Sequence, residues 1–239
     1  LIDSIHSGNI ELVKMLLTKG ASPQIQEMYG RNAYHEAAES GNIELISLIR
    51  TAGGNPLSRD THGRTPFSLV LNKSDETIKA VLGNDINLSD SDGNTPIHIA
   101  VQNKVSSDKI FMLVSMNYPL NRRNSLGLTP LTLAVKNNQN DLAKTLIECG
   151  ADPFVTDNSG ECAVSFAISD NAEVLNYIVQ TTGNKKDMTG EGILHYAART
   201  GDLATIKKLL SMGLDRTMKN ISGETPYDIA IRWQRDSSI

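Results

Sequence analysis

The feature that most constrains this chain is an internal repeat. Residues 7–17 read SGNIELVKMLL and residues 40–50 read SGNIELISLIR, so the same pattern returns after 33 positions. A glycine recurs at similar intervals of 33, 30, 34, 33, 30 and 33 residues, at Gly30, Gly63, Gly93, Gly127, Gly160, Gly190 and Gly223. Periods of this length are typical of arrays in which each repeat is one supersecondary unit. The sequence therefore predicts stacked copies of a small unit.

Each interval predicts two helices followed by a turn. Proline favours the first position of a helix and the threonine before it can cap the helix, which predicts starts at the Thr-Pro pairs 65–66, 95–96, 129–130 and 225–226. In the second helix of the first unit, Ile10, Val13, Leu16 and Leu17 fall on one stripe. Left-handed residues are expected to end such helices at Gly20, Asn117, Gly150 and Gly213. The residues that follow, rich in Asp, Asn and Gly, predict a turn or a hairpin.

A single unit of this length is too small to bury a core, because about 40 residues are needed for independent folding. Neighbouring units can bury each other's apolar faces, which gives a solenoid stabilised by nearest-neighbour contacts. The chain is 39% hydrophobic and only 5% aromatic, so Ala, Leu, Ile and Val must build most of that shared core.

Composition argues against several other classes of protein. The net charge of −4 provides no general attraction for nucleic acid. No apolar run approaches the roughly 18–20 residues that span a bilayer. The two cysteines, Cys149 and Cys162, lack the spacing of a zinc site. We therefore expect no nucleic acid as partner, no membrane insertion, no cofactor and no metal.

The repeated motif resembles the ankyrin repeat. The residues that carry this resemblance are Thr95-Pro96-Ile97-His98 followed by Ala100, and Gly150-Ala151-Asp152 before the next turn. The resemblance implies an all-α solenoid of stacked helix–turn–helix units with short β-hairpin or turn fingers. It covers the chain as a single domain, residues 1–239: a partial repeat 1–29, complete repeats 30–62, 63–92, 93–126, 127–159, 160–189 and 190–222, and a partial repeat 223–239.

Two intervals are three residues shorter than the usual length. We expect the first deletion near the end of the second helix, around Val81, Leu82 and Gly83, and the other in the finger between Gly183 and Gly190. Neither end of the sequence resembles a polar cap. This favours an excerpt from a longer array or a larger protein.

Three histidines, His35, His98 and His195, occupy the same place in different repeats. They could be read as metal ligands or general bases, but their separation favours buried histidines that hydrogen-bond loop backbone. Cys149 and Cys162 are expected to be small packing residues. No catalytic motif is present, so we expect no enzyme activity.

Function is therefore expected at the surface. The resemblance implies a protein–protein interaction scaffold that binds a protein or peptide on its concave face, formed by finger tips and inner helices. The alternative is a regulatory or targeting segment of a larger enzyme, channel or effector protein. The candidate partner-binding residues are Met28, Tyr29, Arg31, His62, Arg64, Asp92, Leu126, Leu128, Met188, Arg199, Arg232 and Trp233.

Some of these positions have structural alternatives. Tyr29 could pack on the next finger, and Trp233 could cover the side of an absent helix. The acidic residues Asp85, Asp90 and Asp92 could face Arg122 and Arg123 across adjacent layers. We expect the segment to be monomeric, and the cytoplasm is the favoured compartment, although no signal in the sequence names one.

Overall fold

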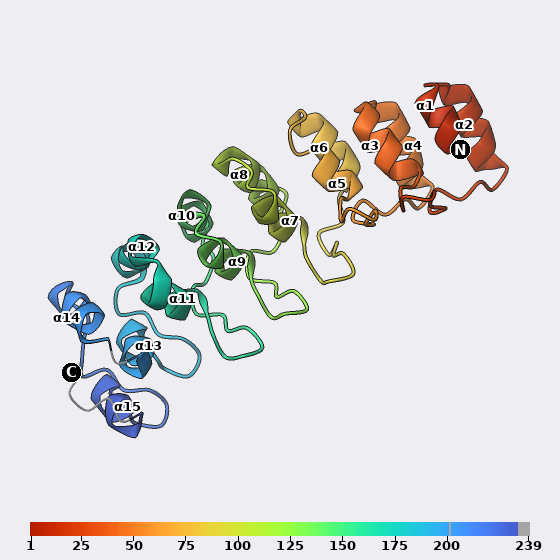
Figure 1. Ribbon diagram of the computed structural model, residues 1–239. Coiled ribbons are helices and arrows are strands. Elements are labelled where there is room, and N and C mark those ends of the chain that lie inside the picture. The colour runs from red at the N-terminus through yellow and green to blue at the C-terminus, as the bar shows by residue number, and fades with distance from the viewer. Residues whose placement is uncertain (201, 234–239) are drawn as a thin grey trace. The chain divides into compact units, whose positions relative to one another are not determined.

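The computed structural model describes residues 1–200 and 202–233, which form fifteen helices and no β-strand (Figure 1). The predicted all-α class is therefore confirmed. The chain divides into two compact units, Leu1–Pro119 and Leu120–Ile239. Residues 234–239 of the expected last partial repeat lie outside the described residues.

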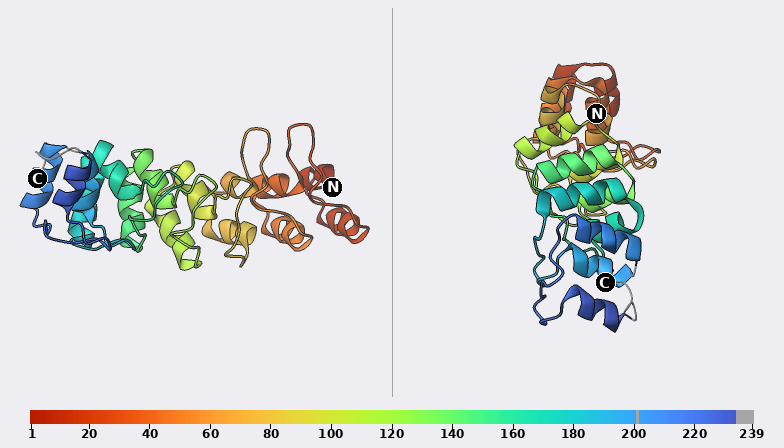
Figure 2. Two further views of the ribbon diagram at one scale, coloured as in Figure 1. Left: turned by 90° about the horizontal axis from the view of Figure 1, so that it is seen from below. Right: turned by 90° about the vertical axis from the view of Figure 1, so that its left-hand side faces the viewer.

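The first unit is a stack of four helix pairs. We call the first helix of each pair inner and the second outer. Each inner helix contacts the next inner helix, and the first three outer helices contact one another in the same order. The loops between successive pairs, which we call fingers, project beside the inner helices (Figure 2). The pairs are α1 (Ile2–His6) and α2 (Ile10–Thr18), α3 (Ala33–Ser40) and α4 (Ile43–Thr51), α5 (Pro66–Leu69) and α6 (Asp75–Leu82), and α7 (Pro96–Gln102) and α8 (Ser107–Ser115).

The second unit repeats this arrangement. Its inner helices contact one another in the order α9, α11, α13 and α15, and the outer helix α10 contacts α12. The helices are α9 (Pro130–Lys136), α10 (Asn140–Glu148), α11 (Ala163–Asp170), α12 (Ala172–Thr182), α13 (Ile193–Thr200), α14 (Leu203–Ser211) and α15 (Pro226–Arg232).

The ends of the helices follow the predicted signals. Helices α5, α7, α9 and α15 all begin with a proline that follows a threonine. The Thr129 hydroxyl, for example, accepts a hydrogen bond from the Thr132 amide at 3.1 Å. After α10, Gly150 has a φ of +94°, which an L side chain rarely adopts. Asn117 has a φ of +64°, as expected because asparagine is, after glycine, the residue most often found in this left-handed position.

The core of each unit is mainly aliphatic and lies between the layers. Leu146 on α10 is fully buried. Tyr34 on α3 is one of the few large aromatic residues of the core, and its hydroxyl donates a hydrogen bond to the Val81 carbonyl at 2.6 Å. Because this polar group has a partner, its burial does not leave an unsatisfied donor.

The structure adds detail to the expected repeat. The fingers are turns, and their β-structure in the described residues is limited to one isolated antiparallel bridge between Gln26 and Asn32. The deletion after Gly63 falls mainly at the end of the second helix, as expected: Gly83 directly follows α6, whereas one further residue stands between α4 or α10 and its glycine. In addition, α5 has only four residues, whereas α7 and α9 each have seven. In the other short interval, α12 extends to eleven residues, and Asn171 alone separates it from α11.

Candidate functional site

Six fingers in the described part of the chain are each closed by one short polar side chain. In the finger before α5, the Asp60 Oδ1 atom accepts hydrogen bonds from the amides of His62 and Arg64, both at 2.9 Å. The same pair of amide contacts, two and four residues further along, recurs in five other fingers, at Asp90, Asn124, Asp157, Asp187 and Asn220. This local closure fixes the turn, so the residues at its tip can project outward.

Contacts between successive fingers hold them in register. The Thr61 amide donates a hydrogen bond to the Tyr29 carbonyl at 3.0 Å in the first unit, and the Ile221 amide donates to the Thr189 carbonyl at 2.9 Å in the second. The backbone approach is close, because a Cβ atom at Gly30 would lie 3.0 Å from the Thr61 nitrogen. The fingers of each unit therefore present a continuous surface. We call this surface, together with the adjoining ends of the inner helices, the finger face.

The repeated histidines stabilise this surface from below. In His35, Nε2 donates to the Arg64 carbonyl of the next finger at 3.2 Å, and Nδ1 accepts from the Asn32 amide at 3.2 Å. His195 makes the matching contact with the Glu224 carbonyl at 3.2 Å. Together with His98, all three are fully buried. The prediction of buried histidines that bind loop backbone is confirmed for His35 and His195.

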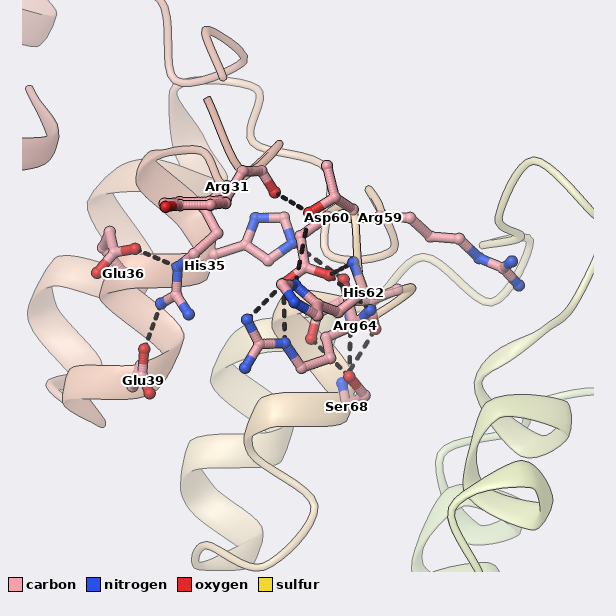
Figure 3. Close-up of polar contacts among 12 residues, drawn as sticks. Arg31, His35, Glu36, Glu39, Arg59, Asp60, His62, Arg64 and Ser68 are labelled. Atoms are coloured by element: carbon pink, nitrogen blue, oxygen red, sulfur yellow. Dashed lines mark hydrogen bonds and ion pairs between the residues drawn. The ribbon is translucent and has the colours of Figure 1, made fainter. Parts of the chain in front are cut away.

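On the finger face of the first unit, most charges neutralise one another. Figure 3 shows the Arg31 guanidinium between Glu36 and Glu39, with its Nε atom 2.5 Å from Glu36. Arg64 pairs with Asp60 of its own finger at 2.8 Å. His62 is exposed at the finger tip. Arg31 and Arg64 therefore lie on the predicted face, but their charges are already balanced.

The acidic residues of the next finger pair with an arginine that the sequence analysis did not single out. Arg59 lies 2.5 Å from Asp90 and 2.6 Å from Asp92. Asp90 and Asp92 therefore pair with the preceding finger, and the expectation that Asp85, Asp90 and Asp92 face Arg122 and Arg123 stays a prediction.

On the second unit, the finger face is hollowed into an open groove of about 680 Å³. Arg199 and Arg232, at the ends of α13 and α15, line this groove together with Trp233 and Glu161. A second hollow of about 400 Å³ adjoins it and shares the two arginines. Three residues predicted from the repeat, Arg199, Arg232 and Trp233, are thus brought together in one groove.

Each arginine of the groove pairs with the glutamate eight positions before it. Arg199 contacts Glu191 and also lies over the Tyr196 ring, 5.0 Å from its centroid. Arg232 pairs with Glu224 at 3.3 Å. In the first unit, the same spacing separates the ion pair of Arg31 and Glu39, but there the arginine comes first and the glutamate follows. This spacing of opposite charges is present in the sequence and could have identified Glu191 and Glu224.

In the adjoining hollow, Asp187 is held in its ionised form. Burial would raise the pKa of its carboxyl, but hydrogen bonds from the Tyr196 hydroxyl at 2.7 Å and from finger amides hold the pKa below its usual value. The ionised Asp187 therefore adds a further negative charge to this side of the unit.

The exposed apolar candidates behave differently from one another. Met28, Leu126 and Met188 are 82%, 68% and 99% exposed, and Tyr29 and Trp233 are also exposed. Leu128 is only 6% exposed, so its assignment to the binding surface is wrong. It directly follows the finger glycine, and this position lies at the base of the finger, where Asn94 and Glu191 are buried as well.

Other kinds of site find little support in the described residues. Among residues 1–200 and 202–233, no three His, Cys, Asp or Glu side chains are grouped so that they could hold a metal ion. Burial raises the pKa of both Cys149 and Cys162, which disfavours the reactive thiolate. In the same part of the chain, no helix has the length and apolar character needed to cross a membrane.

Comparison with known proteins relates this arrangement to one family. A family model described as ankyrin repeats, in three copies, matches residues 67–157 and, overlapping these, residues 97–189. The mouse B-cell lymphoma 3 protein homolog is 31% identical over 156 residues, which cover 59% of this chain and 34% of that protein. The Hydra vulgaris tyrosine-protein kinase HTK16 is 26% identical over 148 residues, or 59% of this chain and 20% of the kinase. The chain therefore spans much less than the full length of these relatives.

A solved structure shows the same fold. The crystal structure of an ankyrin repeat domain from Acinetobacter baumannii superposes with a TM-score of 0.56 at 20% sequence identity, covering 74% of this chain and 95% of that domain.

Proposed function

Since this chain belongs to the ankyrin-repeat family, we propose that it binds a protein or peptide partner on the finger face. Repeats of this family mediate interactions between proteins and are generally non-catalytic. The groove of the second unit carries the proposal, because Trp233 and two arginines line one open hollow. Tryptophan and arginine are enriched among the residues that dominate binding energy at interfaces.

The first unit offers a smaller contribution to this surface. Met28 and Tyr29 project from its first finger, and their size suits them as apolar anchors. The paired charges of Arg31 and Arg64 would then form a polar rim, which contributes more to specificity than to affinity. A partner that also contacts this unit would lose affinity when Met28 and Tyr29 are both replaced by Ala.

The proposal can be tested with a partner purified after affinity capture and then studied with the isolated components. We expect the double variant Arg232→Ala and Trp233→Ala to weaken binding by at least about tenfold, since interface anchors cost about 2 kcal/mol or more when truncated. The matched control is Lys207→Ala on the outer helix α14, where the side chain is exposed. Lys207→Ala should bind like the wild type, and equal affinity of the double variant and the wild type would contradict this groove as the binding site.

We also propose a second role, as a regulatory or targeting segment within a longer protein. The observation in its favour is the match to a tyrosine-protein kinase, of which this chain spans 20%. Catalysis would then belong to residues outside this segment. The full-length transcript tests the idea, and an open reading frame that starts and stops within a few residues of this segment would exclude it.

A further inference from the structure

One carboxylate in the groove differs from its counterparts in the neighbouring layers. Glu191 and Glu224 follow a finger glycine, and each is paired with the arginine eight positions later. Glu161 follows Gly160 in the same way, but Ser169 stands eight positions after it. The Glu161 side chain is exposed, and no hydrogen bond or ion pair to it is found among residues 1–200 and 202–233. This layer therefore presents a carboxylate without an internal counter-ion.

The surroundings of Glu161 add to this negative charge. Four carboxylates line the groove and the adjoining hollow, whereas the same linings contain only two guanidinium groups, those of Arg199 and Arg232. Both arginines are already paired with glutamates of their own layers. Glu161 lines the groove itself, whereas the other three carboxylates line the adjoining hollow. Opposite charges favour association and like charges oppose it, so the groove and the hollow together favour a cationic group over an anionic one. The lining carboxylates are Glu161, Asp187, Glu191 and Glu224.

Trp233 supplies the second element of recognition. It lines the same groove as Glu161, and 53% of its surface is exposed. The face of an indole ring attracts ammonium and guanidinium groups through its quadrupole. A long basic side chain can therefore place its charge beside a carboxylate and its alkyl stem against an aromatic wall.

We propose that this groove binds an arginine or lysine side chain of a partner peptide, with Glu161 as its counter-ion and Trp233 as its aromatic wall. This inference rests on the proposed function and specifies the chemistry of the partner. It also gives Ser169 a role, because a serine at this position leaves Glu161 available to a ligand.

The test uses nine-residue random peptides displayed on phage and selected on the immobilised full chain. An enriched peptide is synthesised with a fluorescent label, and a matched peptide carries norleucine in place of its basic residue. We expect the wild type to bind the basic peptide about tenfold more tightly than the norleucine peptide. Both Glu161→Gln and Ser169→Arg should abolish this difference, since the new arginine would occupy Glu161 as Arg199 occupies Glu191.

Controls separate a loss of charge from a loss of structure. Ser169→Gln changes the same exposed position without adding a charge, and it should keep the tenfold preference. Thermal unfolding, monitored by circular dichroism, checks that each variant is folded. If Ser169→Arg does not fold, Glu161→Gln alone tests the inference. A preference that persists in Glu161→Gln, or enriched peptides without a basic residue, would overturn this inference while leaving peptide binding intact. Failure to enrich any peptide above an unrelated protein would count against the proposed function itself.

Discussion

At the scale of single residues, His35 shows how one buried side chain can join neighbouring repeats. Its two ring nitrogens join the start of its own helix to the next finger. Burial lowers the pKa of His35 below its ordinary value of 6.5. Burial thus favours the neutral form, in which Nε2 donates to the Arg64 carbonyl and Nδ1 accepts from the Asn32 amide.

A pH dependence of stability follows. The unfolded chain takes up a proton at His35 at a higher pH than the folded chain does, so its contribution to stability is lost as the pH falls below about 6.5. We expect His35→Gln to lower the free energy of unfolding by about 1–3 kcal/mol near pH 7.5, through the loss of two hydrogen bonds. The loss should be smaller near pH 5.5. Urea unfolding at both pH values measures it, and an equal loss at both would contradict the assignment.

Leu146 and Glu11 test the assignment of the helix faces. Leu146 is fully buried between helices, whereas the Glu11 side chain is 84% exposed. We expect Leu146→Ala to destabilise the chain by about 2–5 kcal/mol, because the lost side chain leaves a cavity. Glu11→Ala should change stability by no more than about 0.5 kcal/mol. Denaturant unfolding compares them, and similar values would mean that the faces are wrongly assigned.

At the scale of elements, the fingers depend on an acceptor at one position. Asp157 Oδ1 accepts from the amides of Ser159 and Glu161 at 2.8 and 3.0 Å. In the same unit, Asn124 and Asn220 make equivalent contacts with an amide oxygen. We therefore expect Asp157→Ala to cost about 1–3 kcal/mol, through two amides left without this acceptor. Asp157→Asn should cost less than half of that, as measured by thermal unfolding. If both variants lose the same stability, charge rather than turn closure is the important property.

Elements also show what could be predicted from sequence. The starts of α7 and α9 follow from their Thr-Pro pairs, and the end after α10 follows from Gly150, because these signals act within a few residues. The length of α5 could not be predicted in this way. Pro66–Leu69 starts with the same signal, but no local signal marks its early end, and the helix contacts α3, α6 and α7 in the folded chain.

The same distinction holds for the candidate site. Exposure at the finger tips could be predicted from position in the repeat, as Met188 shows. The prediction for Leu128 is wrong because the residue directly after the finger glycine lies at the base of the finger, where the chain is buried again. The pairing of Arg59 with Asp90 and Asp92 joins two fingers. Such a contact depends on how the layers stack, which local sequence signals do not determine.

At the scale of the whole molecule, the stability of each helix should depend mainly on the helices that it contacts. In the second unit, α10 contacts α9 and α12, and α13 contacts α15. Because repeat proteins are stabilised by nearest-neighbour interfaces, we expect Leu146→Ala to accelerate amide hydrogen exchange most strongly in α9 to α12. The increase in α15 should be smaller. Exchange measured by mass spectrometry tests this, and a uniform increase over the second unit would indicate a single cooperative block.

The finger turns have a consequence for how this molecule can change over generations. Each turn is closed by contacts within five residues, such as those of Asp187 with Thr189 and Glu191. Met188, at the tip of the same turn, is 99% exposed and contributes nothing to that closure. Point mutations at such tips can therefore alter which molecules are recognised while the architecture beneath them is inherited unchanged.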